Sequence, residues 1–164
     1  MATLALKPLE LVKIPSGGAA EYEKRTLTTG TPIAGDLGVL TNNEITLCGA
    51  DPTVISYFIQ ASGDSTIPGE TSKLQVVRIH PDYEFEISIY HSTPASAVLA
   101  AADIDGQVEY GIIKATVSGV TAWCLDLEET TTKSVRIVQA VGSFADLYQR
   151  VRVQFLSSRL TFAN

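Results

Sequence analysis

The sequence predicts an all-β fold: an antiparallel β-barrel or sandwich with one short helix and an extended N-terminal arm. Two runs of strict two-residue alternation carry this prediction. Residues 83–89 alternate Tyr, Phe, Ile and Ile with two glutamates and a serine, and residues 150–155 alternate two valines and Phe155 with two arginines and a glutamine. Because successive side chains of a strand point to opposite faces, each run indicates a strand with one apolar and one polar face.

Residues 1–30 are predicted to form the arm, ahead of a β-barrel or sandwich domain over residues 31–164. Pro8 and Pro15 disfavour a helix, and Ser16-Gly-Gly provides a flexible joint. The arm has two open placements, as an edge strand on its own domain or as a strand on a neighbouring subunit, with disorder as a third. We expect residues 2–15 to be needed for assembly binding rather than folding. The candidate contact residues are Leu4, Leu6, Leu9, Leu11, Val12 and Ile14.

The first half of the domain offers short elements separated by turn formers. Residues 31–40 suit a turn that leads into a short strand, and residues 44–48 suit another strand. Residues 51–60 are ambiguous, because Asp51 and Pro52 can begin a helix while the β-branched and aromatic residues favour a strand. Residues 63–70 are rich in turn formers and predict a loop.

The second half of the domain carries most of the expected strands. Residues 74–79 and 83–90 are predicted to pair as a hairpin around His80-Pro-Asp, and the alanine-rich segment 94–102 is the candidate helix. Further strands are expected at 108–117, 121–127, 134–141 and 150–156. Short strands at this spacing are typical of an antiparallel barrel or sandwich.

The composition suits a globular domain with few classes of partner. The chain has 164 residues, 45% hydrophobic and 18% charged, with a net charge of -6 that repels nucleic-acid phosphates. No apolar run reaches the ~20 residues that span a bilayer, and the N-terminus lacks the pattern of a secretory signal. We expect no nucleic-acid partner, no membrane partner and synthesis in the cytoplasm. Cys48 and Cys124 lie in apolar runs and are expected to be reduced and buried, with a disulfide as the alternative.

The sequence offers little catalytic chemistry. His80 and His91 are the only histidines, and the predicted hairpin places them too far apart to share a metal. Asp103-Ile-Asp-Gly lacks the remaining ligands of a calcium loop and predicts a turn. Trp123 shares its strand face with Leu125, which favours core packing over a sugar-stacking platform. We therefore predict no catalytic residue, no metal site and no cofactor, and a protein that is not an enzyme.

Three segments together resemble the decoration, or cement, proteins of tailed-bacteriophage heads. The first is the turn Thr31-Pro-Ile-Ala-Gly-Asp-Leu after an arm, and the second is Ala102-Asp-Ile-Asp-Gly ahead of a strand. The third is the closing series Trp123-Cys-Leu-Asp-Leu, Val135-Arg-Ile-Val and Arg150-Val-Arg-Val-Gln-Phe-Leu. Many of these proteins have Asp-Ile-Gly where this chain carries the additional Asp105.

The resemblance implies a virion structural protein on the outer capsid surface. Such a protein binds the major capsid protein at contacts between capsomers and stabilises the shell, here through the arm. It is commonly a homo-oligomer, a trimer more often than a dimer. Two alternatives stay open. One is a tail or fibre module that binds a host glycan, and the other is a small enzyme or ligand carrier with a pocket such as His91 with Asp103 or Glu109.

Overall fold

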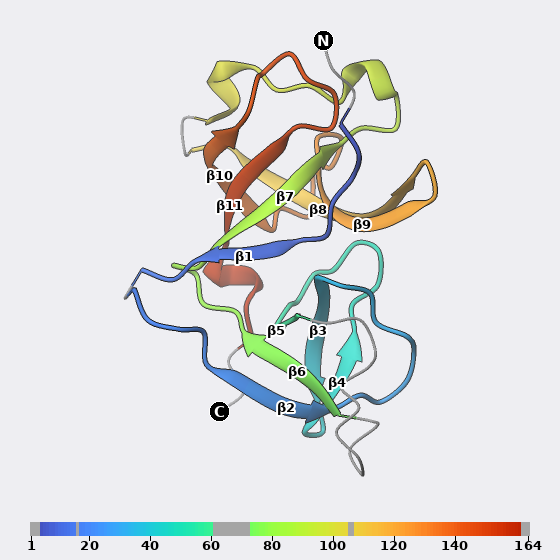
Figure 1. The fold of residues 1–164 in the computed structure, drawn as a ribbon, viewed down its shortest axis with the longest axis vertical. Coiled ribbons are helices and arrows are strands. Elements are labelled where there is room, and N and C mark those ends of the chain that lie inside the picture. The colour runs from blue at the N-terminus through green and yellow to red at the C-terminus, as the bar shows by residue number, and fades with distance from the viewer. Residues whose placement is uncertain (1–3, 16, 61–72, 105–106, 162–164) are drawn as a thin grey trace.

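The computed structural model describes residues 4–15, 17–60, 73–104 and 107–161 (Figure 1). Within these residues, eleven strands form two curled sheets that pack as a sandwich-like all-β fold, and helical structure is limited to three short 3-10 segments. The predicted fold class is confirmed. The described strands cross between the two sheets twice, because β1 belongs to one sheet, β2 to β6 to the other, and β7 to β11 again to the first.

The small sheet is the five-stranded sheet that the described part of residues 22–78 forms. Its strand order is β2 (Tyr22–Thr26), β6 (Lys73–Arg78), β5 (Tyr57–Ile59), β3 (Asp36–Thr41) and β4 (Glu44–Leu47), all antiparallel. The sheet curls until Leu27, directly after β2, forms a parallel bridge with Ile45 of β4. The backbone N–H of Thr28 adds a 2.9 Å hydrogen bond to the Ile45 carbonyl.

The large sheet is the six-stranded sheet formed by the described part of the remaining chain. Its strand order is β1 (Glu10–Lys13), β7 (Glu84–Tyr90), β11 (Arg150–Phe155), β10 (Val135–Val141), β8 (Glu109–Val117) and β9 (Val120–Asp126). Residues 124–126 of β9 pair in parallel with residues 88–90 of β7, so strands β7 to β11 close on themselves. β1 pairs with the first half of β7, beside the segment that β9 occupies.

One hydrophobic core joins the two sheets. Phe58 of the small sheet packs edge-on against Phe85 of the large sheet, with ring centroids 5.4 Å apart, and Phe85 meets Phe155 at 5.2 Å. The predicted alternation of β7 and β11 is confirmed, because their apolar residues point into this core. The core draws on both sheets, with Leu37, Phe58, Val77 and Ile79 from the small-sheet region and Phe85, Ile87, Ile89, Trp123, Leu125, Val151, Val153 and Phe155 from the large sheet.

The N-terminal arm lies on its own chain. Leu9 is 1% exposed and belongs to the core between the sheets, while Leu6 is buried in a second cluster against Ala122 and Cys124. Of the two placements that the sequence left open, the structure has the edge strand, as β1. The first 30 residues therefore contribute one strand to each sheet, β1 and β2. The arm also contacts two buried polar residues of β7: the Lys7 N–H donates a 3.4 Å hydrogen bond to Ser88 Oγ, and Lys13 pairs with Glu84.

Two expectations are wrong. Residues 74–79 and 83–90 do not form a hairpin, because both edges of β6 are occupied by β2 and β5, and His80-Pro-Asp instead carries the chain from one sheet to the other. The segment 94–102 is not one helix but two 3-10 turns, Pro94–Ser96 and Ala101–Ile104. The first turn ends at Ala97, whose φ of -78° and ψ of 55° lie outside the helical region, and Ala97 and Leu99 are then buried in two different clusters.

The remaining segments follow the predictions more closely. The four strands expected after residue 107 are observed as β8 to β11, and those at 31–40 and 44–48 as β3 and β4. The ambiguous segment 51–60 resolves as strand β5 with an isolated bridge from Ile55 to Leu160. The predicted loop 63–70, Ser16 of the joint, and Asp105 and Gly106 of the turn lie outside the described residues.

Candidate docking surface

The residues with catalytic potential are dispersed. His80 Nδ1 lies 3.4 Å from Asp82 Oδ2, in the crossing between the sheets. His91 Nδ1 accepts a 3.0 Å hydrogen bond from the Thr93 backbone and lies 3.7 Å from Glu128 Oε2. Among the described residues, no group of three His, Cys, Asp or Glu side chains could hold a metal ion.

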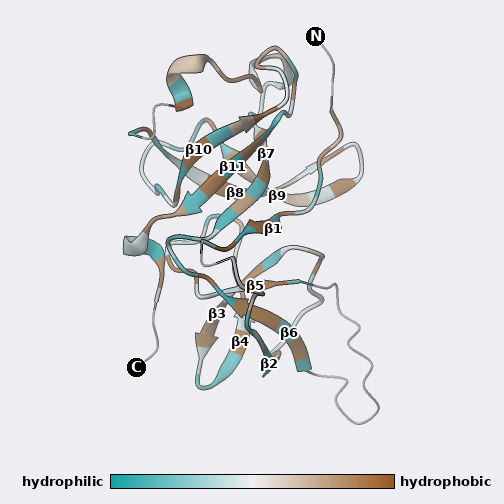
Figure 2. Ribbon diagram, turned by 60° about the vertical axis from the view of Figure 1, so that its left-hand side comes forward, coloured by the Kyte–Doolittle hydropathy of each residue, from teal (hydrophilic) through white to brown (hydrophobic). Residues whose placement is uncertain are grey.

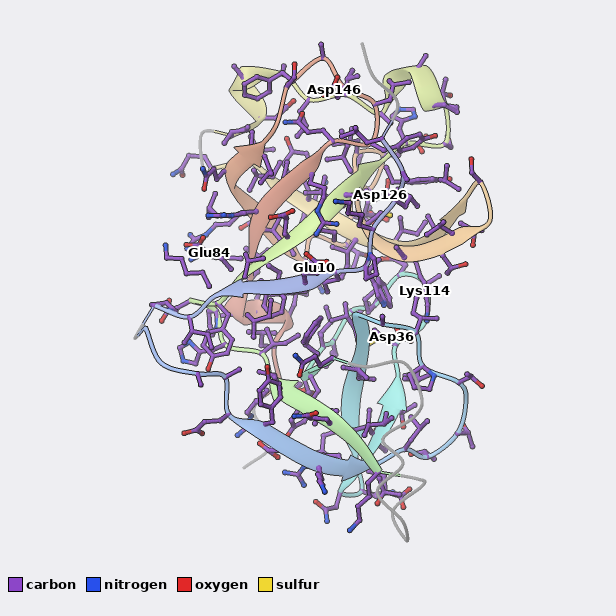
Figure 3. All side chains as sticks on the ribbon, viewed as in Figure 1. Glu10, Asp36, Glu84, Lys114, Asp126 and Asp146 are labelled. Carbon is purple, nitrogen blue, oxygen red and sulfur yellow. The ribbon has the colours of Figure 1, made fainter. Side chains whose placement is uncertain are left out.

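Trp123 is fully buried, which confirms the core placement and rules it out as a sugar-stacking platform. Its Nε1–H donates a 2.7 Å hydrogen bond to Asp36 Oδ1. Lys114 Nζ lies 3.0 and 2.8 Å from the two oxygens of the same carboxylate, and the backbone N–H groups of Ile33 and Leu37 donate to it as well. Figure 3 shows Asp36 and Lys114 close together at the boundary between the two sheets. This carboxylate therefore ties β3 to β8 and β9.

Both cysteines are buried free thiols, as the sequence predicted. Burial raises the pKa of Cys48 to about 12, and the negative charge of Asp36 adds to this effect. Burial likewise raises the pKa of Cys124 to about 12. Because the thiolate is the reactive form, these cysteines are poor nucleophiles at neutral pH.

The acidic segment after β9 is organised by local hydrogen bonds. Burial raises the pKa of Asp126, and the neighbouring Glu128 and Glu129 contribute to the same shift. Glu128 accepts from the backbone and hydroxyl of Ser92, which lowers its pKa. Hydrogen bonds from Thr131 and the Thr132 backbone lower the pKa of Glu129 to about 2. Glu129 is thus satisfied within its own loop, and Glu128 ties that loop to Ser92, the second residue after β7.

Arg150 holds the arm on the large sheet. Although it is charged, it is 6% exposed, and its guanidinium contacts Glu86 Oε1 at 2.6 Å and Glu10 Oε2 at 3.3 Å. It also donates to the Pro8 carbonyl at 3.3 Å. A second ion pair joins Lys13 Nζ to Glu84 Oε1 at 2.6 Å. The polar face predicted for β11 is thus partly an attachment site for the arm.

The arm is also fixed from the side of the small sheet. Gly35 has a φ of +74°, and a Cβ at this position would lie 2.3 Å from the Leu9 carbonyl oxygen. Only glycine allows the turn before β3 to come this close to the arm. Leu9, Gly35, Asp36, Lys114 and Trp123 together form what we call the junction.

The candidate contact residues of the arm differ in how much of each side chain is exposed to solvent. Leu6 and Leu9 are buried in the chain itself, whereas Leu11 and Ile14 are half-buried. Leu4 and Val12 are exposed, at 36% and 38%. A cavity of about 200 Å³, here called the arm furrow, lies between β1 and the segment that leads into β2, and is lined by Leu11, Val12, Lys13, Ile14, Gly18, Ala20 and Tyr22.

A larger apolar hollow lies at the other end of the arm. It measures about 570 Å³ and is bordered on one side by the arm and on the other by the end of the β8–β9 hairpin, which projects from the body in Figure 1. We call it the tip groove. Its lining residues are Leu4, Ala5, Leu6, Pro94, Val117, Ser118, Val120, Leu147 and Tyr148.

Sequence reasoning found the arm but missed the residues that hold it. Arg150 was assigned to a solvent-facing strand side, because alternation does not reveal that a distant segment covers that side. Asp36 and Gly35 stand in a turn that the sequence did mark, since Gly-Asp after Thr31-Pro is a turn signal. Their pairing with Trp123 and Leu9 depends on contacts between residues distant in sequence.

Comparisons with family models, with curated proteins and with solved structures each found no match for this chain. Within the part of the chain that the structure describes, no helix has the length and apolar character needed to cross a membrane.

Proposed function

We propose that the protein is a decoration protein of a tailed-bacteriophage head, which binds the major capsid protein at capsomer contacts and reinforces the shell without catalysing a reaction. The observation that carries the proposal is the character of the accessible hollows beside the arm. The tip groove is lined by uncharged, mainly apolar residues, and Lys13, the one charged residue that lines the arm furrow, is paired with Glu84. Such surfaces suit protein docking.

The arm furrow is the surface proposed to face the capsid. Val12 and Tyr22, exposed at 38% and 45%, present apolar area beside the half-buried Leu11 and Ile14. A patch of this size gives weak affinity by itself, because association costs consume most of the gain from apolar burial. Several copies joined in one oligomer would bind far more tightly, since the later contacts form at high effective concentration.

Co-sedimentation with phage heads that lack the protein tests the proposal. Deletion of residues 2–15 would not test binding alone, because it would also remove strand β1 and the buried Leu9 from the fold. Val12→Lys changes only an exposed position of the furrow, and Val138→Lys is the matched control, since Val138 is 36% exposed on β10. We expect wild type and Val138→Lys to saturate the heads at a fixed stoichiometry and Val12→Lys to bind more weakly.

The opposite results are equally informative. Absence of wild-type binding to any such head would reject the decoration function and direct the search to host glycans, the alternative that the burial of Trp123 disfavours. Binding that Val12→Lys leaves unchanged would reject the arm furrow as the capsid-facing surface while leaving the decoration function in place.

A further inference from the structure

The tip groove is uncharged in a chain that is 18% charged. None of its nine lining residues carries a charge, and the sequence from Ala115 to Leu125 contains no Asp, Glu, Lys or Arg. In Figure 2 the projecting end of the hairpin is white to brown, without the teal of hydrophilic residues. Leu4 and Val120, on opposite walls, are 36% and 39% exposed. Depletion of charge together with exposed apolar side chains characterises the centre of a protein interface.

The hairpin end is closed by a tight, fully paired turn. Val117 pairs with Val120 across a two-residue turn in which Ser118 and Gly119 have φ values of 51° and 80°. These positive φ values suit the tight turn whose twist matches that of the flanking strands. One step further in, the hydroxyl oxygens of Thr116 and Thr121 lie 2.7 Å apart. A projection constrained in this way loses little conformational entropy when it docks.

We propose that the tip groove is the contact between two copies of this chain. In this arrangement, a two-fold axis relates the copies, and the hairpin end of each, residues 117–120, enters the groove of the other. The occupant of the groove is thus a second copy. The proposal does not rest on the capsid function, because it concerns only the isolated protein.

Three observations select a second copy as the occupant. The projection and the groove lie side by side, and Val117 and Val120 belong to both, so a two-fold rotation places each projection at the other copy's groove. Both surfaces are uncharged, so neither leaves a charge unpaired when water is excluded. Each copy buries a projection and a groove at once. A two-fold contact therefore buries two projections and two grooves, a larger area than one groove filled by one segment, and stable interfaces require a large buried area.

The test measures the oligomeric state of the full chain by sedimentation equilibrium, over about three decades of concentration up to about 1 mM. Wild type is expected to be a monomer–dimer equilibrium. Val120→Lys on the hairpin and Leu4→Lys on the opposite wall should each weaken the dimer by roughly tenfold or more, because each buries two unpaired ammonium groups. Val138→Lys, equally exposed on β10, should dimerise as wild type does. Circular dichroism and thermal unfolding confirm that the variants fold.

Each other outcome overturns the proposal. A wild-type monomer throughout this range would mean that the groove does not bind a second copy. In that case, loss of head binding by Val120→Lys would identify a capsid segment as the occupant. A trimer, or a dimer that neither Val120→Lys nor Leu4→Lys weakens, would place the self-association on another surface. Failure of the capsid function alone would leave the dimer and its response to the two variants intact.

Discussion

At its inner end the β8–β9 hairpin is held by a buried carboxylate, whereas at its outer end it presents apolar side chains to solvent. Lys114 and Trp123 bind Asp36 at the junction, and only three residues further along each strand Val117 and Val120 line the tip groove. The same pair of strands therefore serves two purposes. At the inner end, the hydrogen bonds of Asp36 hold the two sheets together. At the outer end, Val117 and Val120 are available for association with another protein surface.

The arm shows the same contrast along its length. Leu9 lies in the core against Gly35, while Leu4, five residues earlier, is exposed at the tip groove. The difference shows that the exposed apolar residues do not reflect a poorly packed protein, because a few residues away the same segments pack closely. If the comparison is right, substitutions at the junction should reduce stability, and comparable substitutions at the outer end should not.

Asp36→Ala is expected to have the largest effect. It leaves Lys114 and the Trp123 N–H without their partner, and removing one member of a buried pair costs about 4 kcal/mol in the free energy of unfolding. Thr121→Ala is the matched change at the outer end of the hairpin, where it removes only an exposed hydroxyl contact, and should cost less than about 0.5 kcal/mol. Urea unfolding measures both, and equal losses would contradict the comparison.

Leu9→Ala and Leu4→Ala compare the two ends of the arm. Truncating the buried Leu9 should lower the free energy of unfolding by about 3 kcal/mol, through lost burial and the cavity left in the core. The same truncation at the exposed Leu4 should cost less than about 0.5 kcal/mol. Thermal unfolding of a dilute, monomeric sample gives the difference. A Leu9→Ala variant as stable as wild type would show that the arm is not part of the folded core.

The sequence alone allowed the fold class and most of the large sheet to be predicted, for a local reason. Alternation in β7 and β11 depends only on residues two apart, so it is visible without knowledge of strand partners. The crossing at His80 and the burial of Arg150 are different, because each depends on which distant segment occupies a strand edge or face. The arm was recognised from Pro8 and Pro15, yet its docking on Arg150 and Gly35 required contacts that no local pattern encodes. The tip groove likewise combines the arm with a hairpin more than 100 residues away.

Gly35→Ala and Gly119→Ala compare two glycines with similar backbone conformations. Both have positive φ, +74° and +80°, but a Cβ at Gly35 would meet the Leu9 backbone at 2.3 Å, whereas nothing lies within 4 Å of one at Gly119. Gly119→Ala should cost about 1 kcal/mol for the left-handed backbone alone. Gly35→Ala adds a clash with main-chain atoms and should cost about 2 kcal/mol or more. Similar values in urea unfolding would show that the arm can move away from the turn.

Glu129 provides the smallest effect and a contrast with the buried carboxylate of Asp36. Its side chain also accepts backbone N–H groups, but in a loop at the surface, where hydrogen bonds to Thr131 and Thr132 lower its pKa from 4.5 to about 2. A carboxyl group with a lowered pKa in the folded state stabilises the fold above its unfolded pKa, and this contribution disappears as the pH falls from 4.5 toward 2.

NMR titration should find the Glu129 carboxyl still ionised at pH 3. In Glu129→Gln the stability should lose this part of its pH dependence, so that the difference from wild type is present at neutral pH and vanishes near pH 2. A Glu129 carboxyl that titrates near 4.5 would show that the loop contacts do not persist in solution. The carboxylate that stabilises the fold by accepting backbone N–H groups would then be the buried Asp36 and not the surface Glu129.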